Sequence, residues 1–155
     1  MKQEFDAIVK ALCDAEQLAR PQPLIDGVAV ELYGVEFSFL YDEEHDPQSM
    51  FLRIVFGHAP LINETAIYQQ LLQQNHIGFN GNGPGFCVSP VSGKVLYLLR
   101  LPLAKATPSL LASTMLYFAE KVKQWRTDYF LPRTIALADR AAFGNAHRPV
   151  SHRST

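Results

Sequence analysis

Apolar residues recur along the chain at two spacings, and the changes between these spacings predict the order of the elements. The first run follows three- and four-residue steps, which are typical of one face of a helix. It holds Phe5, Ile8, Val9, Leu12 and Ala15. Pro21 and Pro23 follow. Because proline is poorly tolerated inside a helix, we expect this helix to end before them.

Alternation of apolar and polar residues then replaces the helical spacing. It runs over residues 28–32 and again over 35–41, with Gly34 between the two runs. Such a pattern predicts two strands joined by a tight turn. After the polar stretch DEEHDPQS, residues 50–56 alternate as well and predict a third strand. We expect these three strands to form an antiparallel meander.

The second half of the chain repeats this change of pattern. Residues 63–77 follow the helical spacing, with Asn63 as the expected N-cap and Gly78 as the expected left-handed C-cap. The stretch FCVSPVSGKVLYLLRLPL predicts a short strand, a turn and a long strand. Thr107 is expected to cap a last helix that has Pro108 at its first position. The order helix, three strands, helix, two strands, helix predicts an α+β domain, a twisted antiparallel sheet with helices packed on it.

The stretch GFNGNGPGF, residues 78–86, is the one glycine-rich segment that suggests chemistry. A phosphate loop needs lysine and then serine or threonine after its last glycine, and Pro84 and Gly85 stand there instead. A dinucleotide loop follows a strand and opens a helix, whereas this stretch follows a helix and opens a strand. We interpret it as a helix end and an irregular connection, not as a phosphate site.

No constellation of residues indicates catalysis or a metal site. The five histidines are scattered, and no two share a helix face at the spacing that zinc favours. The acidic stretch DEEHD lacks the central glycine and distal glutamate of a calcium loop. No G-x-S-x-G motif is present, and Cys87 is interpreted as a small core residue. We therefore expect no catalytic residue, no metal and no cofactor.

Composition and charge favour a single cytosolic domain. The 155 residues, 48% of them hydrophobic, suffice for one core, and no apolar run approaches the roughly 18 residues of a membrane span. Residues 1–60 hold 4 basic and 11 acidic side chains, whereas residues 61–155 hold 10 basic and 4 acidic ones. No nucleic-acid-binding motif accompanies the basic half. We expect neither nucleic acid nor a membrane as a partner.

One strand carries more apolar surface than a sheet with one solvated face requires. In residues 94–101, one face has Val95, Tyr97, Leu99 and Leu101 and the other has Leu96 and Leu98. A strand with a solvated face alternates apolar and polar residues. The second face is therefore covered either within the chain or by another chain, and the pattern fits both alternatives. We expect a homodimer whose interface includes Ile67, Leu71, Leu96 and Leu98.

Three stretches, in this order, resemble the class I type III secretion chaperones, also called the Tir-chaperone family. The strand pair VAVELYGVEFSFLYD is similar to the family's hairpin, with its central glycine and its Tyr-Asp ending. Most of the resemblance lies in LLQQNHIGFNGNGPGFCVSPVSGKVLYLLRLPL, from the leucine-rich helix end to the strand that ends in Arg-Leu-Pro-Leu. The last helix has Trp125-Arg126, where the family often has an aromatic next to a basic residue. The resemblance covers roughly residues 3–128.

This resemblance implies a homodimer in the cytoplasm of a bacterium that has a type III secretion system. Its partner would be a secreted effector, usually encoded beside the chaperone, whose N-terminal region wraps around the dimer in extended form and stays competent for export without ATP. An extended segment can add a strand to a sheet edge and place alternate side chains in apolar grooves. Two features depart from the family: the net charge is near neutral rather than clearly acidic, and the chain continues past the family's usual end.

Residues 1–129 are predicted to form the chaperone-like domain, and residues 130–155 an extension with a short helix and then a disordered tail. Partner binding is expected on the first helix and the sheet beside it. The candidate residues are Phe5, Ile8, Leu12, Val30, Phe37 and Phe39. Some of them must be core residues, because one helix stripe cannot both pack on its own sheet and face a partner. Two alternatives stay open: a chaperone-like domain with another protein partner, and a small-ligand-binding protein or enzyme that uses residues 78–86 as a lid.

Overall fold

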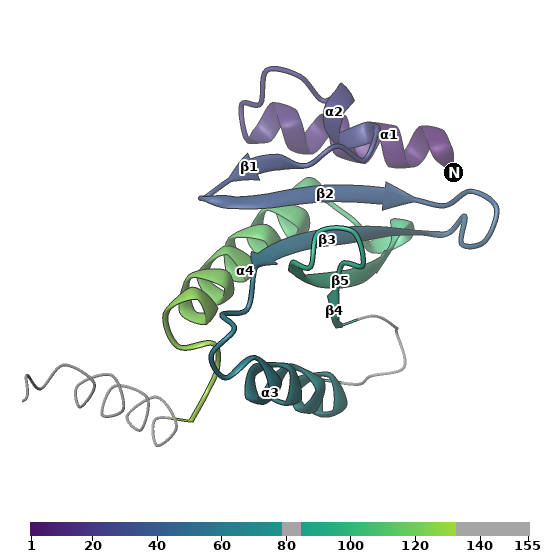
Figure 1. Ribbon diagram of the computed structural model, residues 1–155. Coiled ribbons are helices and arrows are strands. Elements are labelled where there is room, and N and C mark those ends of the chain that lie inside the picture. Colours follow the sequence, from purple (N-terminus) through teal and green to yellow (C-terminus); the bar gives the residue numbers. More distant parts are fainter. Residues whose placement is uncertain (79–84, 133–155) are drawn as a thin grey trace, which may run out of the picture.

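Pairing between strands organises the part of the chain that the computed structural model describes, residues 1–78 and 85–132. In chain order the elements are α1 (Lys2–Ala15), α2 (Gln22–Ile25), β1 (Val30–Leu32), β2 (Val35–Tyr41), β3 (Ser49–Gly57), α3 (Glu64–Ile77), β4 (Phe86–Val88), β5 (Val95–Pro102), a 3₁₀ turn (Leu103–Lys105) and α4 (Pro108–Asp128). The five strands form one antiparallel sheet in the order β1-β2-β3-β5-β4. The predicted α+β architecture and the order of its main elements are confirmed (Figure 1).

The strand register separates two faces of the sheet, because successive side chains of a strand point to opposite sides. One face holds the cross-strand row Phe37, Ile54 and Tyr97. The other holds the row Ser38, Arg53 and Leu98. α1 and α4 pack on the face of the first row: Phe5 stacks on Tyr41, which lies on this face, with 5.1 Å between ring centroids, and Phe118 lies 4.8 Å from Tyr97. We call these the helix-covered face and the second face.

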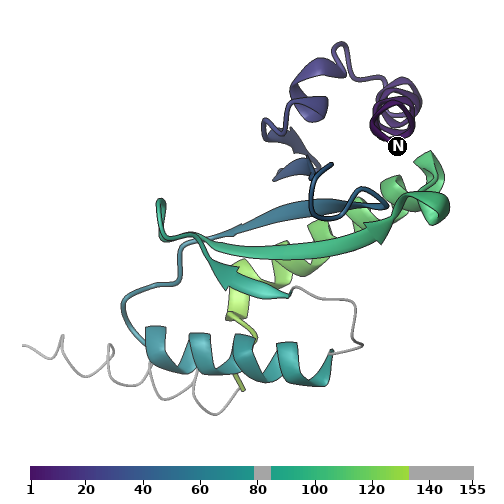
Figure 2. The same ribbon diagram turned by 90° about the vertical axis from the view of Figure 1, so that its right-hand side faces the viewer.

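The two ends of the sheet have different neighbours. α1 and α2 lie at the end of the sheet that β1 forms, and α3 lies at the opposite end, beside β4 (Figures 1 and 2). α4, the longest helix of the described residues, runs along the helix-covered face and reaches both ends. The edge strands of the described sheet are therefore β1 and β4, and different helices lie beside each of them.

Apolar side chains between the helix-covered face and its helices form the core. Its largest fully buried members include Phe5, Leu12, Phe37, Phe39, Leu52, Ile54, Phe56 and Trp125. Burying a side chain of this size contributes roughly 1.5–3 kcal/mol relative to leaving it exposed. The predicted stripe of the first helix is thus mostly its core face, although Ile8 is half-buried and Ala15 exposed.

The helix ends agree with the sequence in α4 and differ in α3. Thr107 Oγ1 accepts a hydrogen bond from Leu110 N, and Pro108 opens the helix as predicted. Asn63 stands at the N-cap of α3, but it has a φ of 63° and its side chain makes no capping bond. Gly78 has a φ of −83° and is not left-handed, so the expected C-cap type is wrong. The helix closes there through the Gly78 amide, which donates to a carbonyl of the preceding turn, and no left-handed residue is needed.

A one-turn helix, α2, stands where the sequence predicted only the end of the first helix. Pro21 is its N-cap and Pro23 lies in its first turn, where a missing N–H costs nothing because that group has no partner in the helix. Leu24 is fully buried and anchors the turn. Gly27 then has a φ of 75°, and a Cβ there would lie 3.3 Å from Phe39 O. The positive φ and the close approach to β2 therefore both favour glycine at this position.

The predicted C-terminal extension lies mostly outside the described residues, which end at Pro132. α4 ends at Asp128, and Tyr129 follows in the left-handed conformation. Phe130 and Leu131 pack against the core, and the Phe130 ring lies 6.4 Å from Phe56 and 6.2 Å from Phe86. The first residues of the predicted extension therefore belong to the packed part of the chain.

Replacing Thr107 with alanine tests the cap of α4. Losing a side-chain cap costs about 1 kcal/mol, so we expect the free energy of unfolding, measured by urea denaturation, to fall by about that amount. Thr127→Ala is the matched control, because its Oγ1 donates to Lys123 O on the surface of the same helix and alanine has the higher helix propensity. The control should be neutral or slightly stabilising. Equal losses in the two variants would contradict the capping role.

Candidate partner-binding surface

The turn between β1 and β2 sets the geometry of one edge of the sheet. Its central residues, Tyr33 and Gly34, have φ values of 55° and 76°. Positive φ values at both central residues are typical of the type I′ turn, whose backbone twist matches the twist of the two strands that it joins. Leu32 and Val35 flank the turn and pair with each other. The predicted tight turn is confirmed, and its type fixes the register of β1.

The outer side of β1 is open in the described part of the chain. β1 stands at the end of the sheet order, so no described strand pairs with that side. The pair that flanks a two-residue turn is hydrogen-bonded, and such pairs alternate along an antiparallel ladder. Leu32 and Val30 therefore bond to β2, whereas Glu31, which is exposed, points its backbone N–H and C=O outward. An extended partner segment could bond to these groups.

Apolar side chains accompany this open strand, and we call residues 28–33 the β1 edge. Val28 is 54% exposed and Tyr33 is 38% exposed, whereas Val30 and Leu32 are half-buried and pack against the core. Exposed apolar groups next to unpaired backbone groups are what an extended peptide needs for both kinds of contact. The β1 edge therefore offers backbone hydrogen bonds and apolar contacts at the same place.

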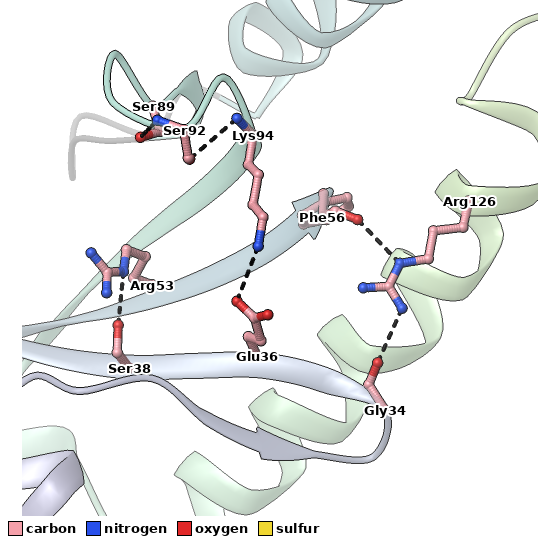
Figure 3. A network of polar contacts seen from close by, with 9 residues as sticks. All are labelled: Gly34, Glu36, Ser38, Arg53, Phe56, Ser89, Ser92, Lys94 and Arg126. Carbon is pink, nitrogen blue, oxygen red and sulfur yellow. Dashed lines mark hydrogen bonds and ion pairs between the residues drawn. The ribbon is translucent and has the colours of Figure 1, made fainter. Parts of the chain in front are cut away.

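Two contacts hold the hairpin turn in position. The Tyr33 hydroxyl donates to the carboxylate of Glu16, just after α1, and this hydrogen bond raises the pKa of Tyr33. Arg126 of α4 donates from Nη1 to Gly34 O (3.0 Å) and from Nε to Phe56 O (3.1 Å) (Figure 3). The turn is thus tied to both helices of the helix-covered face. Sequence reasoning noted Arg126 beside a tryptophan but assigned it no contact.

Four of the six predicted partner-binding residues have no exposed surface. The buried four are Phe5, Leu12, Phe37 and Phe39, each 0% exposed. Their side chains already contact other core residues of the chain, so we assign them to the core. Ile8 and Val30 are half-buried and pack at its margin. These two stay candidates, together with Val28 and Tyr33, which the sequence-based set did not include.

The second face of the sheet carries a mixture of polar and apolar side chains. Two of the predicted dimer residues, Leu96 and Leu98, lie on this face and are half-buried. Lys94 Nζ lies 3.5 Å from Glu36 Oε2, and Arg53 Nε donates to Ser38 Oγ at 2.8 Å (Figure 3). The apolar part of this face is therefore bounded by groups that already have partners.

The other two predicted dimer residues lie on α3 and face the chain's own core. Ile67 is 0% exposed and Leu71 is 4% exposed. The exposed apolar residues of α3 are Leu72 at 66% and Ile77 at 83%. If α3 contributes to a contact with another chain, it does so with this second pair of side chains.

A hollow of about 460 Å³ opens between α3, β4 and α4. It lies beside the two ends of the glycine-rich stretch, residues 78–86, which one of the alternatives takes as a lid. Residues 79–84 of this stretch lie outside the described residues. Aromatic rings such as Phe86 and Tyr97 and the amides of Gln74 and Gln124 line it, with Lys121 as the charged group. The described lining has no carboxylate, histidine or thiol, and therefore no acid–base pair suited to neutral pH.

Nothing in residues 1–78 and 85–132 groups three or more His, Cys, Asp or Glu side chains around a possible metal position. Desolvation raises the pKa of both cysteine thiols, Cys13 and Cys87, whereas a reactive thiol needs a lowered pKa. Cys87 is exposed, so its interpretation as a core residue is wrong. β4 is an edge strand, and Cys87 lies on the side of it opposite to the half-buried Phe86 ring.

The loop between β2 and β3 is fastened to β5 by an ion pair. Arg100 donates from Nε to Asp46 Oδ2 (2.6 Å) and from Nη2 to Asp46 Oδ1 (3.0 Å). Such two-pronged contacts hold both side chains in a fixed geometry. The hydrogen bond from Arg100 lowers the pKa of Asp46. One carboxylate of the acidic stretch DEEHD therefore has a structural role.

Asp46→Asn tests this pair through its pH dependence. An unfolded aspartate has a pKa of about 3.9, and Arg100 holds the pKa of folded Asp46 lower. The pair therefore contributes its full stabilisation at pH values above the unfolded pKa of about 3.9. This stabilisation is lost as the pH falls through the lowered pKa of folded Asp46. We expect the variant to melt at a lower temperature at pH 7 and the difference to narrow as the pH falls below about 4. Glu43→Gln, in the same exposed loop, should show no such difference. A gap that stays constant with pH would speak against the ion pair.

Comparison with known proteins matches the chain to a family model and to solved structures. A family model described as the Tir chaperone protein (CesT) family matches residues 31–126, which is more than half of the chain. One chain in a solved structure described as "Structure of the HopA1-SchA Chaperone-Effector Complex" shares the fold, with a TM-score of 0.61 and 13% sequence identity, over 81% of this chain and 95% of that one. No curated protein matches. No helix in the described part of the chain is long and apolar enough to cross a membrane.

Proposed function

Because this chain belongs to the Tir chaperone protein (CesT) family, we propose that it binds the N-terminal region of a type III secretion effector in extended form and keeps it competent for export. The family match confirms the resemblance seen in the sequence and identifies the chain as a chaperone rather than an enzyme. The structurally similar chain comes from a chaperone–effector complex, which supports the choice of partner. Binding takes place in the bacterial cytoplasm, before export.

The open outer side of β1 is the observation that carries this proposal. Glu31 directs its backbone groups outward, and Val28 and Tyr33 expose apolar surface next to them. A strand added there is held by main-chain hydrogen bonds, while its alternate side chains contact the apolar groups. Such binding requires an unfolded, extended segment and no chemistry, which is what a chaperone without ATP turnover needs.

We further propose that the chaperone is a homodimer and that Leu96 and Leu98 lie at its interface. Both leucines are half-buried on the second face, which neither α1 nor α4 covers. Apolar surface left on a sheet face is commonly covered by another chain. Ile67 and Leu71 are left out of this interface because they are buried within their own chain.

Glu31→Pro tests strand addition at β1. Proline removes the outward N–H and places its ring where a partner strand would bond, whereas the bonds of Val30 and Leu32 to β2 are kept. We expect binding to the N-terminal part of the protein encoded by the adjacent gene, measured by isothermal titration calorimetry, to weaken by about tenfold or more. The melting temperature should change little, because Glu31 is at an exposed edge.

Glu31→Ala is the matched control, because it removes the same carboxylate but keeps the backbone N–H. It should bind the partner nearly as well as the wild type. Equal weakening in the two variants would assign the effect to the side chain rather than to a backbone ladder. Unchanged binding in Glu31→Pro would show that the partner does not use the β1 edge.

Leu98→Glu tests the dimer. A charge buried against an apolar partner surface is strongly unfavourable, so we expect sedimentation equilibrium to show the dimer of the wild type and a monomer of the variant. Leu116→Glu, on the surface of α4 where the side chain is 48% exposed, is the matched control and should leave the dimer intact. A wild-type chain that sediments as a monomer at micromolar concentration would refute the dimer itself.

A further inference from the structure

The far edge of the sheet ends in a different way from the β1 edge. Asn75 of α3 lies against the outer side of β4, where its Nδ2 donates to Phe86 O (2.9 Å) and its Oδ1 accepts from Phe86 N (2.7 Å). One side-chain amide thus bonds both backbone groups of one residue. A residue of a neighbouring antiparallel strand makes the same two bonds in a hydrogen-bonded pair.

The backbone of β4 leaves little else for a further strand to bind. Its bonds toward β5 include Leu98 N to Gly85 O (3.1 Å) and Ser89 N to Lys94 O (2.9 Å). Because the bonding direction alternates along a strand, only Phe86 and Val88 of β4 point their backbone groups outward. Asn75 occupies the groups of Phe86, and Pro90, two residues beyond Val88, has no N–H. Within the described part of β4, only the backbone groups of Val88 therefore remain available for pairing with a further strand.

Gly85 is shaped for this contact. A Cβ at that position would lie 2.2 Å from Asn75 Oδ1 and 2.8 Å from its Cγ, which is far inside the contact distance of carbon and oxygen. Any side chain at residue 85 would therefore displace the Asn75 amide and break both of its bonds to Phe86. The glycine and the asparagine therefore depend on each other, although they lie ten positions apart in the chain.

We propose that Asn75 closes the β4 edge in place of a neighbouring strand, and that it thereby confines strand addition, by a partner or by a second copy, to β1. The directing role rests on the proposed function, whereas the closure concerns this chain alone. Strand edges with free backbone groups invite pairing with other chains. A chaperone that binds extended segments at one edge gains a defined site by closing the other.

The first test is amide hydrogen exchange of Asn75→Ala, followed by NMR. We expect the Phe86 amide to exchange on the order of tenfold faster, because it loses its acceptor, while the Leu98 amide, bonded to Gly85 O, keeps its protection. Gln73→Ala, which removes an exposed amide from the same helix, should change neither rate. Equal acceleration of both amides would mean that β4 detaches as a whole, and an unchanged Phe86 rate would mean that Asn75 does not protect it. Either result overturns the proposal.

The second test asks whether the opened edge pairs with other chains. Sedimentation velocity of Asn75→Ala should show species larger than the wild-type assembly, in proportions that rise with concentration. Gly85→Ala keeps the asparagine but displaces its amide, so it should form the same larger species. This variant also tests the proposal if Asn75→Ala does not fold. Adding Val88→Pro to either variant removes the outward N–H of Val88 and places a proline ring at the opened edge, so it should restore the wild-type assembly.

That restoration separates the proposed role from simple loss of stability, because a second, proline substitution does not rescue a weakened fold. Larger species that persist with Val88→Pro would place the association elsewhere and refute the closure, as would the absence of larger species in both single variants. None of these measurements uses a partner. Their failure therefore cannot be confused with failure of effector binding, which Glu31→Pro tests.

Discussion

Packing of α1 and α4 on one face of the sheet is the interaction on which the other features depend. The buried stripes of α1 and α4 belong to one core with the strands, in which Phe37 and Ile54 pair across β2 and β3. Because a helix stripe cannot pack on its own sheet and face a partner at once, this arrangement removes both stripes from binding. A partner is left with backbone groups at a sheet edge, with side chains at the margin of the core and with the second face.

Periodicity predicts the elements well because one-sided burial imposes it. The alternating runs at 28–32 and 35–41 correspond to β1 and β2, and Gly34 lies in the turn between them. Local chemistry succeeds where its cause is local, as in the Thr107 cap of α4. It fails at α2, whose single turn is too short to show a period and is held by the burial of Leu24 rather than by propensity.

The division between core and binding surface could not be predicted in the same way. Phe5 and Phe37 are apolar residues in periodic runs, and such runs look alike whether they face the core or a partner. Contacts between residues far apart in the chain also leave no pattern in the sequence. Arg126 and Gly34, for example, are joined by a hydrogen bond although they lie 92 positions apart. Gly85 is a partial exception, since a glycine next to a strand can signal close approach of another group, although it does not say that the group is Asn75.

The geometry of β1 bears on how a chaperone can hold a segment and still release it. β1 has three residues, so a strand added there gains few backbone bonds, each contributing only about 0.5–1.5 kcal/mol net. The ties from Glu16 to Tyr33 and from Arg126 to Gly34 hold the turn before binding, which lowers the ordering cost on the chaperone's side. Tight binding then needs several such weak sites along one extended segment. Two linked sites raise the overall affinity without any stronger contact, and each short ladder can still open on its own when the segment is withdrawn.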